Sequence, residues 1–393
     1  MRLPGASEAF VLFDDARERN PAPARLYRDP VEIICADCLE DVQPALDRIA
    51  EAGEMGLHVA GYMSYEAGLM LEDRLQPIAL RQGDHAPAMP LLWFGLFEGH
   101  RLIDPALMPD LLPDPATASI EAPQPLVDEQ AYRAAFTQVQ EYIRAGDIYQ
   151  VNLTFPCAAR FDGDLMALYA AIRPRQRAGY GGIIRTGAHN ILSFSPELFF
   201  TNVRGQLTAR PMKGTAVRSA DPVRDAALAR ELEEDIKQRA ENLMIVDLLR
   251  NDLARVSRAG TVIVPDLFHV ETYPTVHQMV STIRARLLPG LSPVDILRVL
   301  FPCGSITGAP KVRAMEIIDA VEAHPRDIYT GTMGWIDPNG DAAFNVAIRT
   351  IWVEEGSKEG RLGLGSAIVA DSDAASEWAE CLAKGRFLTT AGQ

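Results

Sequence analysis

Residues 182–210 read GIIRTGAHNILSFSPELFFTNVRGQLTAR, and this stretch predicts a series of short, antiparallel strands. The segments 182–186 and 191–195 are rich in apolar and β-branched residues, and a turn at 187–190 separates them. A loop this short reverses the direction of the chain, so the two segments are expected to pair antiparallel. The rest of the stretch repeats the pattern across Gly205, which predicts a second hairpin.

The remainder of the chain mixes strands with helices. The amphipathic segment 129–145 is followed by Gly146, which predicts a helix with a glycine cap at its end. A long helix rich in Arg and Glu is expected from about 222 to 256. Further strands are expected at 57–64, 91–98, 149–155, 198–202, 207–210, 332–336, 343–352 and 361–369, and further helices at 42–52, 312–318 and 374–388. Because hairpins and helices follow one another without a regular βαβ order, the pattern predicts an α+β fold.

A proline-rich segment divides the chain. Residues 104–128 contain six prolines, which is unfavourable for a regular helix or a central strand, so this segment is expected to be a surface linker or a long crossover. It separates an N-terminal part, 1–103, from a C-terminal region, 129–393, that holds the candidate catalytic residues.

Composition and charge exclude several classes of function. The chain has 393 residues, a hydrophobic fraction of 48% and a net charge of −15. These values fit a globular protein and disfavour nucleic acid or an anionic membrane as partners, which would need a basic face. No apolar stretch approaches 18 residues and the N-terminus does not resemble a secretory signal, so we expect no membrane span and a cytoplasmic location.

The five cysteines are scattered and odd in number, which favours reduced thiols. Cys35 and Cys38 form a single C-x-x-C, but no second Cys or His pair follows at zinc spacing. We therefore expect two buried thiols there, in preference to a zinc or redox site.

Two glycine-rich segments could bind anions. Residues 304–311 read GSITGAPK ahead of a helical stretch, but the spacing is wrong for a P-loop and no Ser or Thr follows Lys311. The segment is either an anion-binding helix entry or a plain turn. Residues 363–367 read GLGSA, and they lack the third glycine and the following helix of a dinucleotide-binding motif. A backbone concavity that could hold a carboxylate fits this second segment better.

Three glutamates are candidates for a metal site. Glu377 and Glu380 are three residues apart on one predicted helix face, and Glu241 lies on the long helix. Solvated helix faces often carry such glutamates, so this pattern alone leaves both interpretations open. If the carboxylates converge, their oxygen atoms suit Mg²⁺.

Several motifs, in order along residues 126–390, resemble those of the chorismate-utilising enzymes. This family includes the anthranilate synthase large subunit, aminodeoxychorismate synthase component I, and isochorismate and salicylate synthases. The motifs are DIYQVN (147–152), SPELF (195–199), RPMKGT (210–215), AENLM (240–244), VDLLRNDLAR (246–255), GSITGAPK (304–311), AIRT (347–350) and DSD (371–373). The resemblance implies two large, mainly antiparallel sheets packed together, with helices outside and the active site between them.

The resemblance also implies roles for individual residues. Glu241 and Glu380 would hold Mg²⁺, with Glu377 beside them, and Glu197 would protonate the departing C4 hydroxyl of chorismate. The residues that would bind this dianionic substrate are Thr307, Gly308, Lys311, Tyr329, Arg349, Gly365 and Ser366. Together, the metal ion, the arginine and the lysine would make the electrostatic potential of the site positive, although the protein as a whole is acidic.

Two positions distinguish the branches of the family. Isochorismate and salicylate synthases have a lysine base where this chain has Gln150, and a glutamine cannot take a proton from water. Anthranilate synthase has an alanine where this chain has Lys213. In having a lysine at this position, the chain resembles the aminodeoxychorismate branch. This resemblance implies that the lysine attacks C2 of the ring covalently while the C4 hydroxyl leaves. The alternatives are an anthranilate synthase large subunit with an unusual lysine and a silent regulatory paralogue.

The resemblance implies a source of nitrogen as well. No glutaminase signature surrounds any of the five cysteines, so ammonia would be supplied from glutamine by a separate amidotransferase subunit. The product, 4-amino-4-deoxychorismate, would serve p-aminobenzoate and folate biosynthesis.

Overall fold

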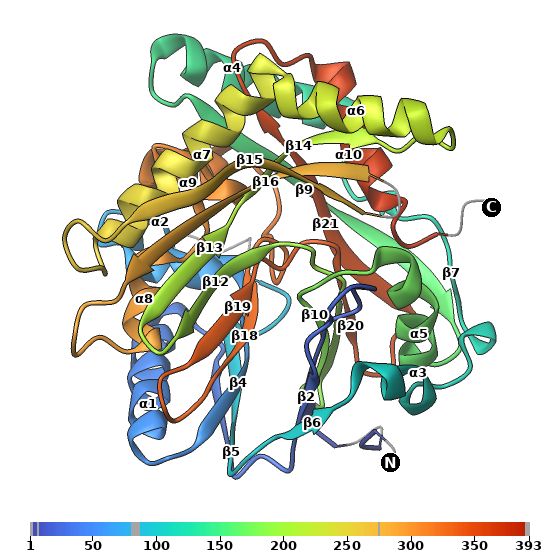
Figure 1. Cartoon of the computed structure of the whole chain (residues 1–393), viewed down its shortest axis with the longest axis vertical. Helices are drawn as coiled ribbons and strands as arrows, with labels where there is room; N and C mark the ends of the chain where they lie inside the picture. Colours follow the sequence, from blue (N-terminus) through green and yellow to red (C-terminus); the bar gives the residue numbers. More distant parts are fainter. Residues whose placement is uncertain (1–2, 6–7, 80–86, 274–275, 390–393) are drawn as a thin grey trace.

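A computed structural model of the chain describes residues 3–5, 8–79, 87–273 and 276–389. Within these ranges, an eleven-stranded and a ten-stranded sheet, both antiparallel, face each other, with helices on their outer surfaces (Figure 1). The expected α+β class with two large packed sheets is confirmed.

The first sheet runs across the C-terminal region and the start of the chain. Its order is β17 (Gly308–Ala309), β9 (Gln150–Asp162), β21 (Glu359–Ile368), β20 (Thr350–Glu354), β11 (His189–Ser193), β10 (Gly181–Arg185), β1 (Phe10–Asp14), β2 (Ala24–Arg28) and β6 (Arg101–Ile103), with β7 (Ser119–Ile120) and β8 (Gln124–Pro125) paired to β9.

The second sheet likewise combines distant parts of the chain. Its order is β14 (Met212–Val217), β16 (Val276–Arg286), β13 (Gln206–Arg210), β12 (Leu198–Val203), β19 (Ala342–Asn345), β18 (Thr332–Ile336), β4 (His58–Met63), β5 (Leu92–Phe97) and β3 (Glu32–Ala36), with β15 (Ile263–Thr272) paired to β16. Strands from 1–103 therefore enter both sheets, and the proline-rich segment 104–128 passes along the edge of β9 through β7 and β8.

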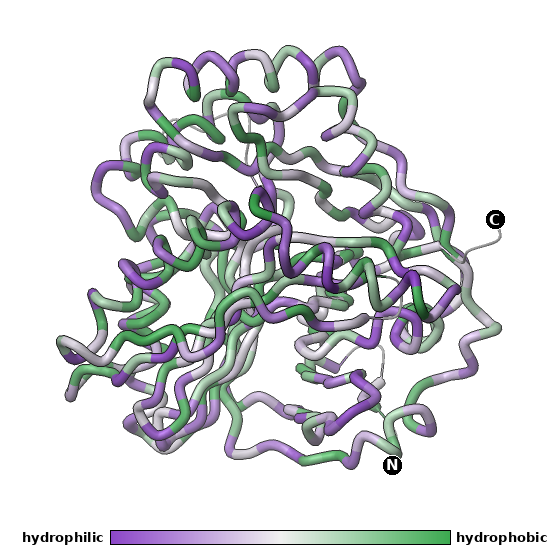
Figure 2. Tube along the Cα trace, turned by 45° about the horizontal axis from the view of Figure 1, so that its top comes forward, coloured by the Kyte–Doolittle hydropathy of each residue, from purple (hydrophilic) through white to green (hydrophobic). Residues whose placement is uncertain are grey.

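Three hydrophobic clusters correspond to the layers. One lies between the sheets and includes Tyr27, Ile184 and Trp352 from the first and Tyr62, Trp93 and Met333 from the second. The other two lie between each sheet and the helices on its outer surface. Those helices are α1 (Val42–Glu54), α4 (Glu129–Ala145), α5 (Leu165–Gln176), α7 (Ile236–Ala254), α8 (Pro293–Leu300), α9 (Lys311–Val321) and α10 (Ala374–Gly385). Helix α6 (Pro222–Glu234) lies against β14 and β15 without contributing to either cluster. In Figure 2 the helices at the top of the view alternate hydrophobic and hydrophilic residues along the chain.

Most predicted elements are confirmed, including the two hairpins β10–β11 and β12–β13, and two are wrong. Helix α4 spans 129–145 and ends at Gly146, which has φ +81, and β18 covers 332–336. The helix expected at 222–256 is broken, because Asp235 has extended backbone and its side chain caps α7 by accepting from the Gln238 N–H. The strand expected at 343–352 is two strands, β19 and β20, which belong to different sheets.

The expectation of buried thiols at Cys35 and Cys38 is also wrong. Both side chains are exposed. Partial desolvation of the sulfur and the charge of Asp37 raise the pKa of the Cys35 thiol. The Cys38 thiol donates to the Asp41 carboxylate, which raises the pKa of Cys38. Raised thiol pKa values disfavour thiolate chemistry at this site.

No helix in the described ranges combines the length and the apolar character that a membrane crossing requires.

Candidate active site

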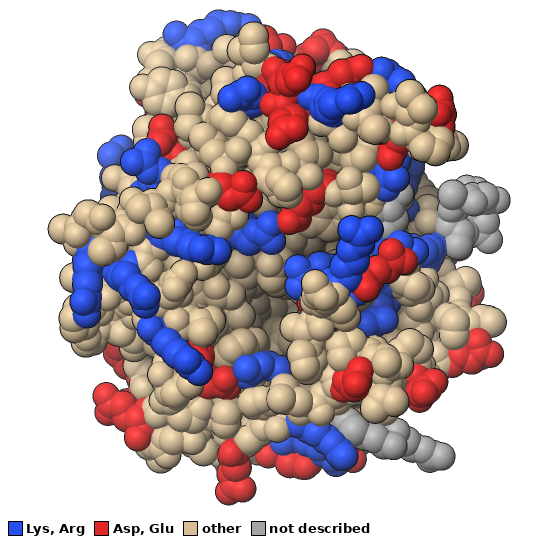
Figure 3. Space-filling model, in the orientation of Figure 1, with Lys and Arg blue, Asp and Glu red and all other residues tan. Residues whose placement is uncertain are grey.

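The candidate site lies where the two sheets diverge. Figure 3 shows a hollow on the face seen in Figure 1, between the sheets, with Lys and Arg side chains near its rim. The motif residues that carry possible acid, nucleophile and anion-binding groups come from β14, η5 (Gly304–Ile306), α7, β21 and α10, and from the segments between β11 and β12 and between β19 and β20. Elements far apart in sequence therefore contribute to one site.

Glu197 is a buried carboxylic acid in the segment between β11 and β12. Its side chain is 4% exposed, and the Ser305 hydroxyl donates to its Oε1 at 2.7 Å. Burial raises the pKa of Glu197 to about 7, although the Ser305 hydrogen bond and the charge of Lys213 favour the ionised form. An acid with this pKa is partly protonated at neutral pH and is suited to proton donation.

Lys213 lies on β14, half-buried, and its surroundings lower the pKa of its amine. Burial lowers its pKa, and the neighbouring cation Lys384 lowers it further, against the opposing charges of Glu241, Glu197 and Glu380. The next residue, Gly214, has φ +99, and a Cβ there would lie 3.2 Å from the Cβ of Met279. This glycine permits the backbone turn that follows the lysine.

The three candidate metal ligands lie on two helices. The charge of Glu377 acts on Glu241, but the three carboxylates do not meet at one point. Glu241 is on α7, and burial raises its pKa together with the charges of Asp371 and Glu377. On α10, Glu380 pairs with Lys384 at 2.7 Å, and Glu377 accepts from the Ser372 hydroxyl at 2.7 Å.

Another group in the described part of the chain brings three potential ligand atoms within 4.8 Å of one another. It consists of His58, His100 and Asp337, which the sequence patterns did not indicate. The three glutamates do not form such a group in this structure.

Arg349 is placed to bind an anion. It lies between β19 and β20 with φ +50, and its guanidinium donates to the Gln176 side chain at 3.3 Å. Burial lowers its pKa, and within the described ranges it has no ion pair. A desolvated guanidinium without a carboxylate partner attracts an anionic ligand.

Thr307 and Gly308 form a buried edge next to η5. Thr307 accepts from the backbone N–H of Asn152 at 2.8 Å, and Gly308 pairs with Val151 on β9. A Cβ at Gly308 would lie 2.3 Å from the Gln150 carbonyl oxygen, so this position requires glycine.

The structure contradicts the predicted role of Lys311. Its Nζ is buried, pairs with Asp252 on α7 at 2.6 Å and donates to the Leu300 carbonyl at 2.9 Å. The ammonium is already neutralised and hydrogen-bonded, so it is not available to bind substrate, and we assign it a structural role.

The other residues predicted to bind substrate are Gly365 and Ser366 of β21 and Tyr329, and they differ in what they could offer a ligand. The Gly365 carbonyl accepts from Lys384 at 2.9 Å, so this lysine, which sequence reasoning missed, links β21 to Glu380. The Ser366 side chain is buried toward Tyr132 and Cys381, so only its backbone could contact a ligand. The ring of Tyr329 covers Gly363, and it borders a cavity of about 470 Å³.

Comparison with known proteins establishes the family. A family model described as chorismate binding enzyme matches residues 8–390. The chain belongs to this family. Aminodeoxychorismate synthase component 1 of Klebsiella aerogenes is 43% identical over 258 residues, which cover 66% of this chain and 57% of that protein. Anthranilate synthase component 1 of Methanothermobacter marburgensis is 32% identical over 402 residues, covering 98% of this chain and 82% of that protein.

A solved structure supports the fold of this chorismate-binding enzyme. Anthranilate synthase component I from Streptococcus pneumoniae superposes with a TM-score of 0.78 at 24% identity, covering 99% of this chain and 94% of that one. The similarity to the Klebsiella protein spans only a little over half of that protein's length, 57%.

Proposed function

We propose that the chain is an aminodeoxychorismate synthase component 1 that aminates chorismate at C4. The proposal rests on one observation above all, the presence of Lys213 near the buried acid Glu197, in surroundings that lower the pKa of the amine and raise the pKa of the carboxyl. The similarity to aminodeoxychorismate synthase component 1, 43% identity over 258 residues, supports the same choice, since anthranilate synthase component 1 is 32% identical over 402 residues.

The arrangement supports a two-stage substitution. Nζ of Lys213 forms a bond to C2 while the ring double bonds shift and the C4–O bond breaks, and the hydroxyl leaves as water with the proton of Glu197. Ammonia then attacks C4, the double bonds shift back and the C2–N bond breaks, which restores the lysine. The proton that the new C4 ammonium loses returns to the Glu197 carboxylate. Arg349 and the backbone of Gly365 hold the carboxylates of the substrate. Each step follows from the chemistry of an activated amine and a positioned acid.

The glutamates fit Mg²⁺ in donor chemistry. Oxygen ligands suit this ion, and a cation would relieve the repulsion from Asp371 and Glu377 that helps to raise the pKa of Glu241. Glu380 would exchange its partner Lys384 for the ion. When bound, Mg²⁺ would supply a positive charge for a substrate carboxylate.

We expect Glu380→Gln and Glu241→Gln each to reduce turnover by about tenfold or more and to raise the Mg²⁺ concentration needed for half-maximal rate. Each change removes one charged oxygen ligand, and losses of this size are typical when metal sites are disturbed. Chelation should abolish turnover by the unaltered chain, and added Mg²⁺ should restore it.

The control is Glu129→Gln. Glu129 forms an i,i+4 pair with Arg133 on α4 that matches the Glu380–Lys384 pair on α10. It should leave the metal requirement unchanged. A Glu380→Gln protein with full activity in a chelator would refute the metal assignment.

We expect the isolated chain to use ammonia and not glutamine. The buried thiols of Cys157, Cys303 and Cys381 have raised pKa values, mainly through burial, which disfavours the thiolate that a glutaminase needs. Turnover with ammonium should increase with pH as NH₃ replaces NH₄⁺, and glutamine should become a donor only when an amidotransferase subunit is added. Glutamine-dependent turnover by the purified chain would contradict this expectation.

An anthranilate synthase is the second candidate, since the Methanothermobacter relative matches over 98% of this chain. The two candidates differ in product, because one aminates C4 and the other C2. Incubation with chorismate and ammonium, followed by separation of the products and mass and ultraviolet spectra, decides between them. A chain that binds chorismate without turnover would instead be a silent paralogue.

A further inference from the structure

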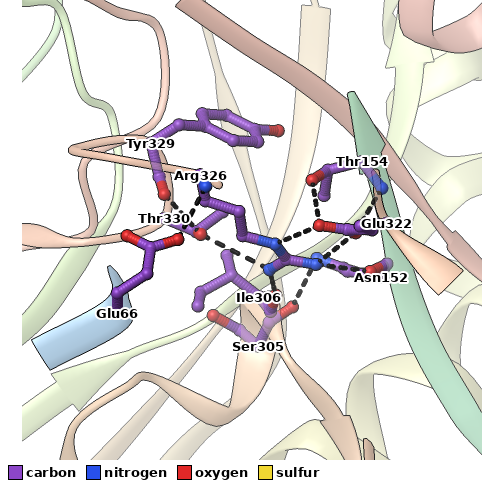
Figure 4. Close-up of polar contacts among 9 residues, drawn as sticks. All are labelled: Glu66, Asn152, Thr154, Ser305, Ile306, Glu322, Arg326, Tyr329 and Thr330. Carbon is purple, nitrogen blue, oxygen red and sulfur yellow. Dashed lines mark hydrogen bonds and ion pairs between the residues drawn. The ribbon is translucent and has the colours of Figure 1, made fainter. Parts of the chain in front are cut away.

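Arg326 is a fully buried arginine outside the group of residues described above. Its side chain is 2% exposed and lies just beyond the C-terminal end of α9 (Figure 4). The carboxylate of Glu322 accepts from its Nε at 2.8 Å and from its Nη2 at 2.7 Å. This bidentate pair satisfies the charge of the guanidinium.

The remaining donors of Arg326 bind backbone carbonyls in two other elements. Nη1 donates to Ile306 of η5 at 3.1 Å, and Nη2 donates to Asn152 of β9 at 2.8 Å. The Glu322 carboxylate in turn accepts from the backbone N–H and the hydroxyl of Thr154 at 2.8 and 3.0 Å. The pair thus ties α9, β9 and η5 together, as the dashed lines in Figure 4 show.

The segment that Arg326 holds is the one that carries Ser305. Asn152 strengthens the attachment through two hydrogen bonds. Its side-chain amide donates to the Ser305 carbonyl at 3.4 Å, and its backbone N–H donates to the Thr307 carbonyl at 2.8 Å. The Ser305 hydroxyl then donates to Oε1 of Glu197 at 2.7 Å. A continuous chain of contacts runs from the guanidinium to the acid.

An arginine is needed for this arrangement. Its planar fork presents five donors in fixed directions, whereas a lysine ammonium at the same depth could satisfy Glu322 but not both carbonyls at once. The backbone N–H of Arg326 also donates to Oε1 of the buried Glu66 at 2.7 Å, and its guanidinium lies 4.5 Å from the ring of Tyr65. Both contacts fix the position from which the fork reaches η5.

We propose that Arg326 is a positioning residue, which holds Ser305 against the Glu197 carboxylate and so sets how readily that acid gives up its proton. The inference deepens the proposed function, on which the role of Glu197 as the acid rests. The other groups that act on Glu197 are Lys213 of β14, the backbone N–H of Met212 and the buried thiol of Cys303. None of these is attached to Arg326 by a described hydrogen bond.

The test is a direct titration of the Glu197 carboxyl by infrared difference spectroscopy, with Glu197→Gln as the blank. Ser305→Ala should raise the titration midpoint by about one pH unit, a tenfold change in the ionisation constant, because a hydrogen bond to the charged form is lost. Arg326→Lys should raise it in the same direction. The double variant should move it no further than Ser305→Ala alone.

A matched control is Arg25→Lys, which alters a partly buried Arg–Asp pair, Arg25–Asp337, that is not connected to η5. It should leave the midpoint unchanged. If Arg326→Lys does not yield folded protein by circular dichroism, the isosteric Glu322→Gln tests the same attachment. An unmoved midpoint in the Arg326 or Glu322 variant, or a shift that adds fully to that of Ser305→Ala, would overturn the proposal.

The titration does not depend on turnover, so the two proposals fail separately. An unaltered chain that forms no aminated product refutes the proposed function, while the midpoints still decide the role of Arg326. If turnover is present, Arg326→Lys should lower kcat more than it changes KM, since the guanidinium acts on the acid through its hydrogen bonds to Glu322, Ile306 and Asn152.

Discussion

Lys213→Ala is expected to lose C4 amination by about two orders of magnitude or more, the scale of a positioned catalytic group. The substitution removes the amine from β14. The turn at Gly214 and the hydrogen bond from the Asn242 side chain to the carbonyl of residue 213 depend on backbone atoms, so both are retained. The loss should therefore be chemical and not a failure to fold. The substitution also introduces alanine, the residue that anthranilate synthases have at this position. Residual amination should therefore shift toward C2.

The measurement supplies ammonium, which bypasses any partner subunit, and quantifies both the C4 and the C2 products. Lys358→Ala is the control, because Lys358 is an exposed lysine whose ammonium donates to the Gly163 carbonyl and to none of the candidate site residues. It should retain the parent rate. If the Lys213→Ala chain forms the C4 amine as fast as the parent, Lys213 is not the nucleophile.

Glu197→Gln is expected to reduce kcat by about 10²- to 10⁴-fold. Glutamine has the shape of the glutamate and can still accept from Ser305, but it cannot donate a proton to the leaving hydroxyl. Because the pKa of Glu197 is about 7, the protonated acid is present below this pH and is lost as the pH rises through it. The chain should therefore lose kcat above about pH 7 when the concentration of free ammonia is held constant and saturating.

The pH profile separates this role from a structural one. In Glu197→Gln the descending limb assigned to the carboxyl should disappear, and the remaining rate should follow the ionisation of Lys213. Since burial lowers the pKa of that amine, the remaining rate should increase with pH at a lower pH than for a free lysine. A glutamine variant with an unchanged descending limb would mean that another group is the acid.

Local structure was predictable wherever the signals lie within the chain segment itself. The helix 129–145 with its Gly146 cap and the strand 332–336 follow from periodicity and cap chemistry alone. The helix break at Asp235 was missed because the apolar and charged pattern continues across it, and a single residue with extended backbone interrupts the hydrogen-bond ladder. The split of 343–352 was missed because a change of sheet leaves no mark in residue type.

The sequence by itself determined the family, the choice of Lys213 and Gln150 that separates its branches, and the types of group that the site can use. Only the tertiary structure decided which of those groups are available. It paired Lys311 with Asp252, turned Ser366 toward Tyr132, and left Arg349 with the neutral side chain of Gln176 and no ion pair among the described residues. It also brought Ser305 to Glu197 across more than a hundred residues of chain. The physical reason is that ion pairs, burial and the pKa shifts they cause depend on distances between separate elements, which residue spacing along a chain does not specify.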